Sequence, residues 1–342
     1  MLSERQVLLR EWLEAVLGCD ELELSSASSD ASFRRYWRFR HRDRSLIAVD
    51  APPQTENNAA FVRMARALRD TGLNVPAIVA EDQVRGFMLV TDLGQRLYLD
   101  HLSSDNVDRL YGDAIGALIA LQAAGPRNGL PAYDADFLRR ELGIFDEWLL
   151  GGLLSIRVDD ELRALLDAVY EILLKNALEQ PTVCVHRDFH SRNLMLADRG
   201  NPGILDFQDA VLGPVSYDLV SLLKDCYIDW PRARVEDWAM AYFNLATESG
   251  VLRAEQAPRF LRWFDLMGVQ RHLKAAGIFC RLWLRDDRSD YLQYLPRTLG
   301  YVVALHPCYP ELSPLTEFLS DRVMPRLNAD KSSYGPIRST AR

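Results

Sequence analysis

The sequence has little lysine, no close pair of cysteines and no long apolar run. Four of its 40 basic residues are lysines, and none of them precedes residue 175, so the N-terminal half carries its positive charge as arginine. The lysines are Lys175, Lys224, Lys274 and Lys331. Any function that needs a lysine must therefore use the second half of the chain.

The five cysteines are dispersed and form no C-x-x-C pair. This spacing disfavours a zinc site or a disulfide framework and predicts reduced thiols in a cytoplasmic protein. Glu4, Glu11 and Glu14 interrupt the first apolar residues, so we expect no signal peptide. No apolar run approaches the ~18 residues that span a bilayer, so we expect no membrane association.

The overall charge is acidic, with a formal net charge of −8. A protein that binds the nucleic acid backbone needs a basic face, so nucleic acid is not expected as a partner. Nothing in the sequence implies an obligate protein partner, and a small-molecule substrate is the remaining expectation.

Hydrophobic periodicity divides the chain into a small β-rich part and a larger helical part. Strand-like runs and one helix follow an amphipathic first helix up to residue 94, whereas helical spacing dominates residues 95–328. We predict an α+β fold with a small nucleotide-binding lobe (1–94) and a helical catalytic and substrate lobe (95–328). The polar residues 329–342 are expected to be a disordered tail.

One short window carries the chemistry of phosphoryl transfer. His186, Asp188 and Asn193 form the pattern H-R-D-x-x-x-x-N, and Asp206 opens a D-F-x step after a short apolar run. Transfer from ATP requires a carboxylate that orients the attacking hydroxyl, together with an amide and a second carboxylate that hold Mg²⁺. We predict Asp188 as the catalytic base and Asn193 and Asp206 as magnesium ligands.

Four polar residues around this window are predicted to support it. His186 and His190 are expected to brace the loop by hydrogen bonds, and a zinc site is disfavoured because no cysteine lies at ligand spacing. Asp209 and Asp218 follow the metal-binding step. Asp218 is expected to anchor the catalytic loop or to cap a helix.

These residues resemble the aminoglycoside phosphotransferase and choline kinase superfamily, whose signature is H-x-D-x-H-x-x-N followed by D-F-x-x. The chain has His186-Arg-Asp-Phe-His-Ser-Arg-Asn193 and Asp206-Phe-Gln-Asp209 in these places. The second histidine separates this superfamily from protein kinases. The resemblance implies a bilobal protein-kinase-like fold, ATP and Mg²⁺ as cofactors, and a small hydroxylated acceptor.

Further segments look like one branch of that superfamily, the anomeric sugar kinases of peptidoglycan recycling. The segments are Asp30–Tyr36, Asp50–Pro53, Thr91–Gly94 and Gln270–Phe279. The resemblance implies phosphorylation of N-acetylmuramate or N-acetylglucosamine at the C1 hydroxyl.

The helical lobe, where we expect the acceptor to bind, contains a segment with an excess of positive charge. Residues 258–300 contain eight basic and four acidic side chains, although the chain as a whole is acidic. A carboxylate-bearing sugar suits arginine or lysine, so Arg271 and Lys274, three residues apart on one helix face, are predicted acceptor contacts. His190 and Asp225 are further predicted acceptor contacts. The alternative for each basic residue is a solvated helix face.

The ATP side departs from the usual kinase pattern. The small-residue loop predicted at Ser25–Ser32, before the first predicted strand, has serine and alanine instead of glycines, and the strand Leu46–Asp50 lacks the phosphate-binding lysine. We expect Arg34 or Arg35 to supply that charge and Glu56 to orient the arginine. The alternative is that both arginines only decorate the strand surface. The predicted ATP contacts are Ser32, Phe33, Arg34, Arg35, Thr91 and Leu93, with a hinge at Leu89–Leu93.

Other functions remain open at this point. Choline or ethanolamine, homoserine and aminoglycosides are alternative acceptors within the superfamily, although a basic pocket disfavours the cationic ones. The missing lysine also admits a catalytically silent nucleotide-binding protein, but the set Asp188, Asn193 and Asp206 argues for an enzyme.

Overall fold

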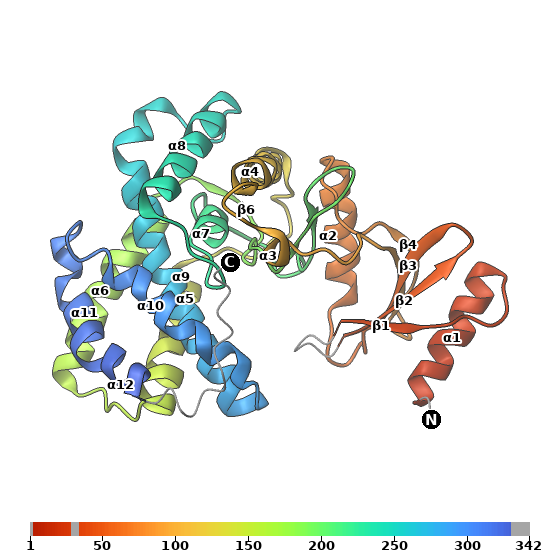
Figure 1. The fold of residues 1–342 in the computed structure, drawn as a ribbon, viewed down its shortest axis with the longest axis horizontal. Coiled ribbons are helices and arrows are strands. Elements are labelled where there is room, and N and C mark those ends of the chain that lie inside the picture. The colour runs from red at the N-terminus through yellow and green to blue at the C-terminus, as the bar shows by residue number, and fades with distance from the viewer. Residues whose placement is uncertain (1–2, 29–33, 330–342) are drawn as a thin grey trace. The chain divides into compact units, whose positions relative to one another are not determined.

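The computed structural model describes residues 3–28 and 34–329 (Figure 1). The chain forms two units, unit 1 from residues 1–128 and 192–209 and unit 2 from residues 129–191 and 210–342. The predicted boundary at residue 94, which divides the lobes by function, stays a prediction. The predicted tail from residue 329 lies outside the described residues apart from its first residue.

Unit 1 contains a five-stranded antiparallel sheet with the strand order β1-β2-β3-β5-β4. The strands are β1 (Ser25–Ser28), β2 (Arg35–His41), β3 (Arg44–Asp50), β4 (Ile78–Asp82) and β5 (Phe87–Thr91). A tight turn joins β2 to β3, with Arg42 in the left-handed region at φ 53°. This hairpin brings Arg38 on β2 opposite Ile47 on β3.

The helix α1 (Glu4–Leu17) covers one face of the sheet. It begins at a capping box formed by Ser3 and Gln6, and it ends at Gly18, whose φ of 62° suits glycine. Its apolar side chains form one cluster with inward-facing residues of β2, β3 and β5. The fully buried members are Leu9, Leu13, Ala48, Phe87 and Leu89. Burial of each large side chain stabilises the fold by about 1.5–3 kcal/mol.

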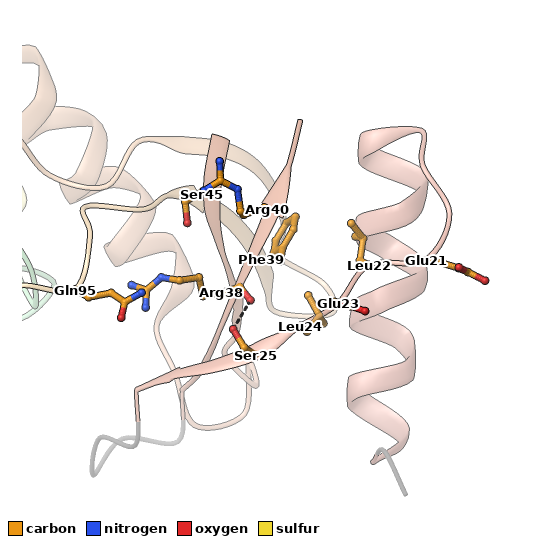
Figure 2. A pocket seen from close by; sticks show the side chains of 10 residues that line it. All are labelled: Glu21, Leu22, Glu23, Leu24, Ser25, Arg38, Phe39, Arg40, Ser45 and Gln95. Carbon is orange, nitrogen blue, oxygen red and sulfur yellow. Dashed lines mark hydrogen bonds between the residues drawn. The ribbon is translucent and has the colours of Figure 1, made fainter. Parts of the chain in front are cut away.

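The predicted loop at Ser25–Ser32 is wrong for its first four residues. Ser25–Ser28 forms the edge strand β1, which pairs with β2 around an irregularity between Ser26 and Ser28. The Ser25 hydroxyl donates to the Arg38 carbonyl at 3.0 Å (Figure 2). Serine and alanine give no strand signal in a sequence, because an edge strand is held by backbone pairing and not by buried side chains.

The rest of unit 1 consists of helices and one small hairpin. These elements are α2 (Asn58–Asp70), α3 (Tyr98–His101), α4 (Val107–Ala124), β7 (Leu194–Met195) and β8 (Gly203–Ile204). The hairpin β7–β8 is tied to the first part of unit 1 by backbone bonds from Ile204 to Asn74 (2.8 Å) and from Leu196 to Arg96 (2.7 Å). Residues 192–209 therefore belong to the same unit as the sheet.

Unit 2 is built around α9 (Ala257–Asp286), a helix of 30 residues that is buried on most of its circumference. The other α-helices are α5 (Ala135–Ile144), α6 (Asp160–Leu178), α7 (Tyr217–Leu223), α8 (Arg232–Glu248), α10 (Leu295–Val303), α11 (Ser313–Phe318) and α12 (Met324–Ala329). π-helical turns lie at Phe145–Leu153 and Leu319–Val323, and 3₁₀ turns lie at Ala254–Gln256, Ser289–Tyr294 and Pro310–Leu312. The π-helix at Phe145–Leu153 packs closely on α9, because a Cβ at Gly277 would lie 2.5 Å from the Ile144 carbonyl oxygen.

A two-stranded ribbon in unit 2 leads into the catalytic window. Its strands are β6 (Thr182–Val185) and β9 (Val211–Pro214), which pair in antiparallel fashion. Gly213 is needed in β9, since a Cβ there would lie 2.9 Å from the ring of Tyr133. No helix of the described residues is long and apolar enough to cross a membrane.

Candidate active site

The catalytic loop begins where the buried strand β6 ends, at His186. Asp218, in the first turn of α7, accepts hydrogen bonds from the backbone N–H groups of His186 (2.6 Å) and Arg187 (2.9 Å). Arg187 has a φ of 78°, an unfavourable value for a residue with a side chain, so these two bonds hold the loop in a strained turn. The predicted contact between Asp218 and the loop is present in the structure.

Asp218 is completely buried, and burial raises its pKa to about 6. The two backbone N–H bonds and the nearby His186 act in the opposite direction but do not cancel the effect. This carboxylate is therefore ionised at neutral pH and takes up a proton in mild acid.

Asp188 lies two residues after His186 with 44% of its side chain exposed. Burial alone raises the pKa of its carboxyl, but the charges of Lys274, His190 and Arg271 outweigh that effect and hold the pKa below its ordinary value. Asp188 is therefore an ionised carboxylate that is still accessible. A group of this kind can orient a hydroxyl and accept its proton.

Two histidines lie beside Asp188. The Asp188 backbone N–H donates to His186 Nδ1 at 3.3 Å, and His190 Nε2 lies 3.9 Å from the Asp188 carboxylate. Burial lowers the pKa of His190 although Asp225 and Asp188 oppose this, so His190 is neutral at pH 7. Its ring lies edge-on to Tyr227, with the centroids 5.5 Å apart. These contacts brace the loop, and a contact of His190 with substrate stays a prediction.

Asp225 closes the far end of the same loop. It is 1% exposed and accepts hydrogen bonds from the Ser191 N–H (3.0 Å), the Ser191 hydroxyl (2.5 Å) and the Tyr227 N–H (3.0 Å). The catalytic loop is thus held at its start by Asp218 and at its end by Asp225. The predicted role of Asp225 as an acceptor contact is untested.

A buried cluster centred on Glu141 of α5 was not expected from the sequence. We call it the Glu141 cluster and define it as Tyr133, Glu141, Arg187, Tyr217, Gln270 and Lys274. Glu141 forms ion pairs with Arg187 and with Lys274 (2.9 Å), and it accepts hydrogen bonds from Tyr133 and Gln270. Burial raises the pKa of Glu141, but the two cations outweigh it and the net pKa is lowered. These contacts fix Arg187, the residue before Asp188 in the catalytic loop, to the helix α5.

Lys274 and Arg271 differ in their partners, although both were predicted as acceptor contacts. Lys274 bonds Glu141 and also donates to the Tyr217 hydroxyl at 3.0 Å. Arg271, 6% exposed, has one hydrogen-bond partner among the described residues, Cys226 Sγ at 3.6 Å. The structure gives Lys274 two internal oxygen partners and gives Arg271 one weak sulfur partner.

The predicted magnesium ligands lie together in unit 1. Asn193 Nδ2 is 3.4 Å from Asp206 Oδ2, and the Leu205 N–H donates to the Asn193 carbonyl at 2.9 Å. Asp206 follows β8 with a φ of 63°, and its other oxygen accepts from Gln208 at 2.7 Å. Asp209, three residues further on, is exposed. Its role in supporting the site stays a prediction.

The chemistry of this pair fits Mg²⁺, a hard cation that prefers amide and carboxylate oxygens. Across residues 3–28 and 34–329, no group of three or more His, Cys, Asp or Glu side chains is arranged to hold a metal. Mg²⁺ in phosphoryl transfer takes one or two protein oxygens and completes its shell with phosphate and water. Two protein ligands therefore suffice.

The arginine proposed to replace the missing lysine is found paired as expected. Arg34 Nε lies 3.0 Å from Glu56 Oε2, and both side chains are largely buried. The Arg34 guanidinium lies over the ring of Phe61 on α2 (5.2 Å), and Phe61 stacks on Phe207, the residue after Asp206 (5.0 Å). A continuous stack thus connects Arg34 to the metal-ligand segment within unit 1.

Of the other predicted ATP contacts, three are among the described residues and two are not. Arg35 is exposed at the start of β2, and Ser32 and Phe33 lie outside the described residues. The Thr91 hydroxyl accepts from the Ala77 N–H at 2.8 Å, and Leu93 packs on Gly203 of β8. All of these contacts remain predictions.

The predicted hinge is fixed through Asp92. Arg38 donates to both carboxylate oxygens of Asp92 (2.6 and 2.9 Å), and the Ser45 hydroxyl donates to one of them (2.6 Å). Burial raises the pKa of Asp92, but these bonds outweigh it and the net pKa is lowered. Arg38 and Ser45 also line a pocket of about 650 Å³ together with the segment Glu21–Ser25 that leads into β1 (Figure 2).

A second pocket of about 500 Å³ in unit 1 lies next to the hinge. It is lined by Asp92–Gly94 together with residues 196–199 after β7. Neither pocket includes Asn193 or Asp206. The structure thus brings Asn193 and Asp206 together in unit 1 and Asp188, His186, His190, Asp218, Asp225, Arg271 and Lys274 together in unit 2. That both groups act on one nucleotide and one acceptor stays a prediction.

Comparison with known proteins agrees with this geometry. The model of the phosphotransferase enzyme family matches residues 23–264. The N-acetylmuramate/N-acetylglucosamine kinase of Pseudomonas aeruginosa is 46% identical over 298 residues, which cover 87% of this chain and 88% of that one. The enzyme of the same name from Neisseria meningitidis serogroup B is 40% identical over 325 residues, which cover 94% and 96%.

Solved structures show the fold. A choline kinase from Streptococcus pneumoniae aligns with a TM-score of 0.64 at 12% identity, covering 88% of this chain and 100% of that chain. An ethanolamine kinase from Plasmodium vivax also gives 0.64 at 13% identity, covering 90% and 88%. The predicted α+β, protein-kinase-like fold class is confirmed.

Proposed function

The chain belongs to the phosphotransferase enzyme family, and from this premise we propose that it transfers the γ-phosphate of ATP to the anomeric hydroxyl of N-acetylmuramate and N-acetylglucosamine. The observation that carries the proposal is the identity of 40–46% with kinases named for these two sugars, over most of both chains. Such a reaction serves the recycling of cell-wall amino sugars in the cytoplasm, where ATP is present and where the five free cysteines stay reduced.

The mechanism assigns the metal to unit 1. The Asn193 amide oxygen and the Asp206 carboxylate would hold Mg²⁺, which neutralises charge on the β- and γ-phosphates when it is bound. Arg34, oriented by Glu56, adds a fixed positive charge for the phosphates. Leu89–Leu93 would contact the adenine through the backbone.

The acceptor is assigned to unit 2. Asp188, ionised and 44% exposed, aligns the sugar hydroxyl and receives its proton as the oxygen attacks the γ-phosphorus. An anomeric hydroxyl is more acidic than an ordinary alcohol, so alignment contributes more than proton removal. Asp218 and Asp225 keep the Asp188 loop in the required conformation.

The direct test is an ADP-release assay with Mg²⁺-ATP and each candidate acceptor. We expect turnover with the two amino sugars, a phosphate on C1 by ³¹P NMR, and no turnover with choline, ethanolamine, homoserine or an aminoglycoside. Asp188→Asn should lower kcat by about 10²–10⁴-fold and leave ATP affinity within about threefold. A near-normal kcat in this variant would remove Asp188 from the mechanism, and phosphate on a different acceptor would replace the proposed substrate.

A second variant tests the proposed phosphate-binding arginine. Arg34→Ala removes a guanidinium that is held by Glu56, so we expect the KM for ATP to rise and kcat to fall, by about tenfold or more in kcat/KM. Arg35→Ala, at the exposed neighbouring position, is the matched control and should change kcat/KM by less than about twofold. Equal effects in the two variants would assign no special role to Arg34.

A further inference from the structure

Arg271 is a buried cation without a carboxylate partner. Its residue is 6% exposed, and among the described residues no carboxylate oxygen lies within 4.0 Å of its guanidinium. The contact with Cys226 Sγ at 3.6 Å is weak, because a thiol is a poor acceptor. Burial lowers the pKa of Arg271, and neighbouring acidic groups, Asp225 and Asp188 among them, outweigh it and raise the pKa, but neither carboxylate bonds its guanidinium. A buried guanidinium with unused donors is typical of a site completed by an anionic ligand.

The two buried lysines of unit 2 show the contrast. Lys224 lies 2.5 Å from Asp265, and Lys274 lies 2.9 Å from Glu141. Each of these cations already has its counter-ion inside the protein. Of the two predicted acceptor contacts, Lys274 thus has a counter-ion inside the protein, whereas Arg271 has, among the described residues, no carboxylate within 4.0 Å and one weak hydrogen bond.

Arg271 lies near residues of unit 2 that the proposed function assigns to the acceptor. Its nearest partner, Cys226, follows Asp225, which bonds the end of the catalytic loop through Ser191. The positive charge of Arg271 acts on both Asp188 and His190. Arg34, Asn193 and Asp206, the residues assigned to the nucleotide, all belong to unit 1. An anion on Arg271 is thus more consistent with the acceptor than with the nucleotide.

The segment beside Arg271 also has aromatic surface. Tyr227 lies edge-on to His190 (5.5 Å) and to Tyr294 (4.8 Å), and Arg297 fixes its backbone by donating to the Tyr227 carbonyl at 2.7 Å. Aromatic faces held in this way suit the apolar face of a sugar ring. A sugar that also carries a carboxylate would use both the rings and the guanidinium.

We propose that Arg271 is the specificity-determining residue that binds the carboxylate of the acceptor, the lactyl group of N-acetylmuramate. The inference rests on the proposed function, because it presumes an amino sugar as the acceptor. N-Acetylglucosamine lacks the carboxylate, so it binds without this contact, and Lys274 still lowers the pKa of Asp188 when the guanidinium is removed. The two acceptors thus differ at one interaction.

The test measures kcat/KM for both sugars in Arg271→Gln. A charge-assisted hydrogen bond in a buried site corresponds to a loss of roughly 10- to 100-fold. We expect that loss with N-acetylmuramate and less than about threefold change with N-acetylglucosamine. Arg259→Gln is the matched control, since Arg259 is an exposed arginine on the same helix and its removal changes the net charge equally.

A change in the substrate provides a second, independent measurement. The methyl ester of N-acetylmuramate lacks the charge and is larger by only one methyl group, so the wild type should lose the same roughly 10- to 100-fold on esterification. Arg271→Gln should treat acid and ester alike. The non-additivity of the two changes isolates the contact between guanidinium and carboxylate.

Each outcome decides the proposal. Equal losses with both sugars in a variant of unchanged Tm would show that Arg271 serves the transferred phosphoryl group or the base, and would overturn the inference while the proposed function stands. If Arg271→Gln fails to fold, equal use of acid and ester by the wild type still overturns it. A wild type that phosphorylates neither sugar overturns the proposed function, and the inference with it.

Discussion

Two buried clusters in unit 2 have nearly the same chemistry but different neighbours. In the Glu141 cluster, one carboxylate receives a lysine, an arginine and a tyrosine. In a second cluster, which we call the Asp265 cluster, Asp265 receives Lys224 (2.5 Å), Arg232 (2.9 Å) and the Tyr309 hydroxyl (2.8 Å). In both, burial raises the pKa of the carboxyl and the cations outweigh it.

The two clusters differ in where their arginine lies in the chain. Arg187 is part of the catalytic loop and precedes Asp188, whereas Arg232 begins α8 and has no such neighbour. The Asp265 cluster joins α8 and α9 to the segment that carries Tyr309. The Glu141 cluster thus bonds the residue next to Asp188, whereas the Asp265 cluster reaches the catalytic loop only indirectly, through Lys224, the neighbour of Asp225.

The largest effect is expected when the central carboxylate of either cluster is removed. Glu141→Ala and Asp265→Ala each remove the counter-ion of a buried lysine, Lys274 or Lys224, which costs about 3–5 kcal/mol in the free energy of unfolding. Glu141→Ala should also lower kcat by roughly 10- to 100-fold, because Arg187 no longer fixes the loop. Urea unfolding and steady-state kinetics check both expectations.

The kcat values of the two variants decide whether the two clusters differ in function. Asp265→Ala, assayed where it is fully folded, should keep kcat within about twofold of the wild type. A similar loss of kcat in both variants would show that the clusters do not differ in function. Unchanged kcat in Glu141→Ala would remove the loop-fixing role from the Glu141 cluster.

A pH experiment on unit 2 compares two buried groups, His272 and Asp218. Their shifted pKa values change the stability with opposite signs as the pH rises. His272 donates from Nε2 to the Lys224 carbonyl at 2.8 Å, and burial together with Arg271 lowers its pKa to about 3. Between pH 4 and 6 its folded form therefore binds fewer protons than the unfolded chain, and stability rises with pH. For Asp218, with a pKa raised to about 6, the folded form binds more protons and stability falls as pH rises.

Removal of each group should change the slope of stability against pH in opposite directions. Between pH 4 and 6, His272→Gln should reduce the slope by about 1.4 kcal/mol per pH unit, and Asp218→Asn should increase it by a similar amount. Urea midpoints measured across this range provide the test. Parallel profiles for the two variants would contradict the assigned protonation states.

The smallest effect is expected from the tyrosines. Tyr133→Phe and Tyr309→Phe each remove one hydrogen bond to a carboxylate, worth about 1–3 kcal/mol. Tyr133 is 3% exposed, so its loss should be the greater. Since Arg187 and Lys274 still hold Glu141, kcat in Tyr133→Phe should change less than about threefold. A tenfold loss would mean that the phenol itself positions the loop.

The segment from His186 to Asp206 could be singled out from the sequence because its pattern is local, while the roles predicted for Asp188, Asn193 and Asp206 stay predictions. The window from His186 to Asp206 carries its own spacing, and the pairing of Arg34 with Glu56 follows from the need to replace a missing lysine. The strand β1 is different, since Ser25–Ser28 shows no apolar alternation and only its pairing partner makes it a strand.

The Glu141 cluster could not be predicted for a physical reason. Glu141 sits on an amphipathic helix, where a glutamate normally faces solvent, and its partner Arg187 is 46 residues away. Only tertiary packing brings α5, α9 and the catalytic loop to the same carboxylate. The difference between Lys274 and Arg271 has the same origin, because both are basic residues on one helix and only the structure shows which already has a partner.

The absence of lysine from unit 1 has a practical consequence for labelling studies. Reagents that acylate amines, such as acyl phosphates of nucleotides, mark kinases through the lysine next to the phosphates. Unit 1 contains no lysine at all, so such a reagent should modify none of its side chains. A survey based on amine chemistry would therefore overlook the nucleotide site that we propose in unit 1, and a dicarbonyl reagent selective for guanidinium groups is the appropriate probe.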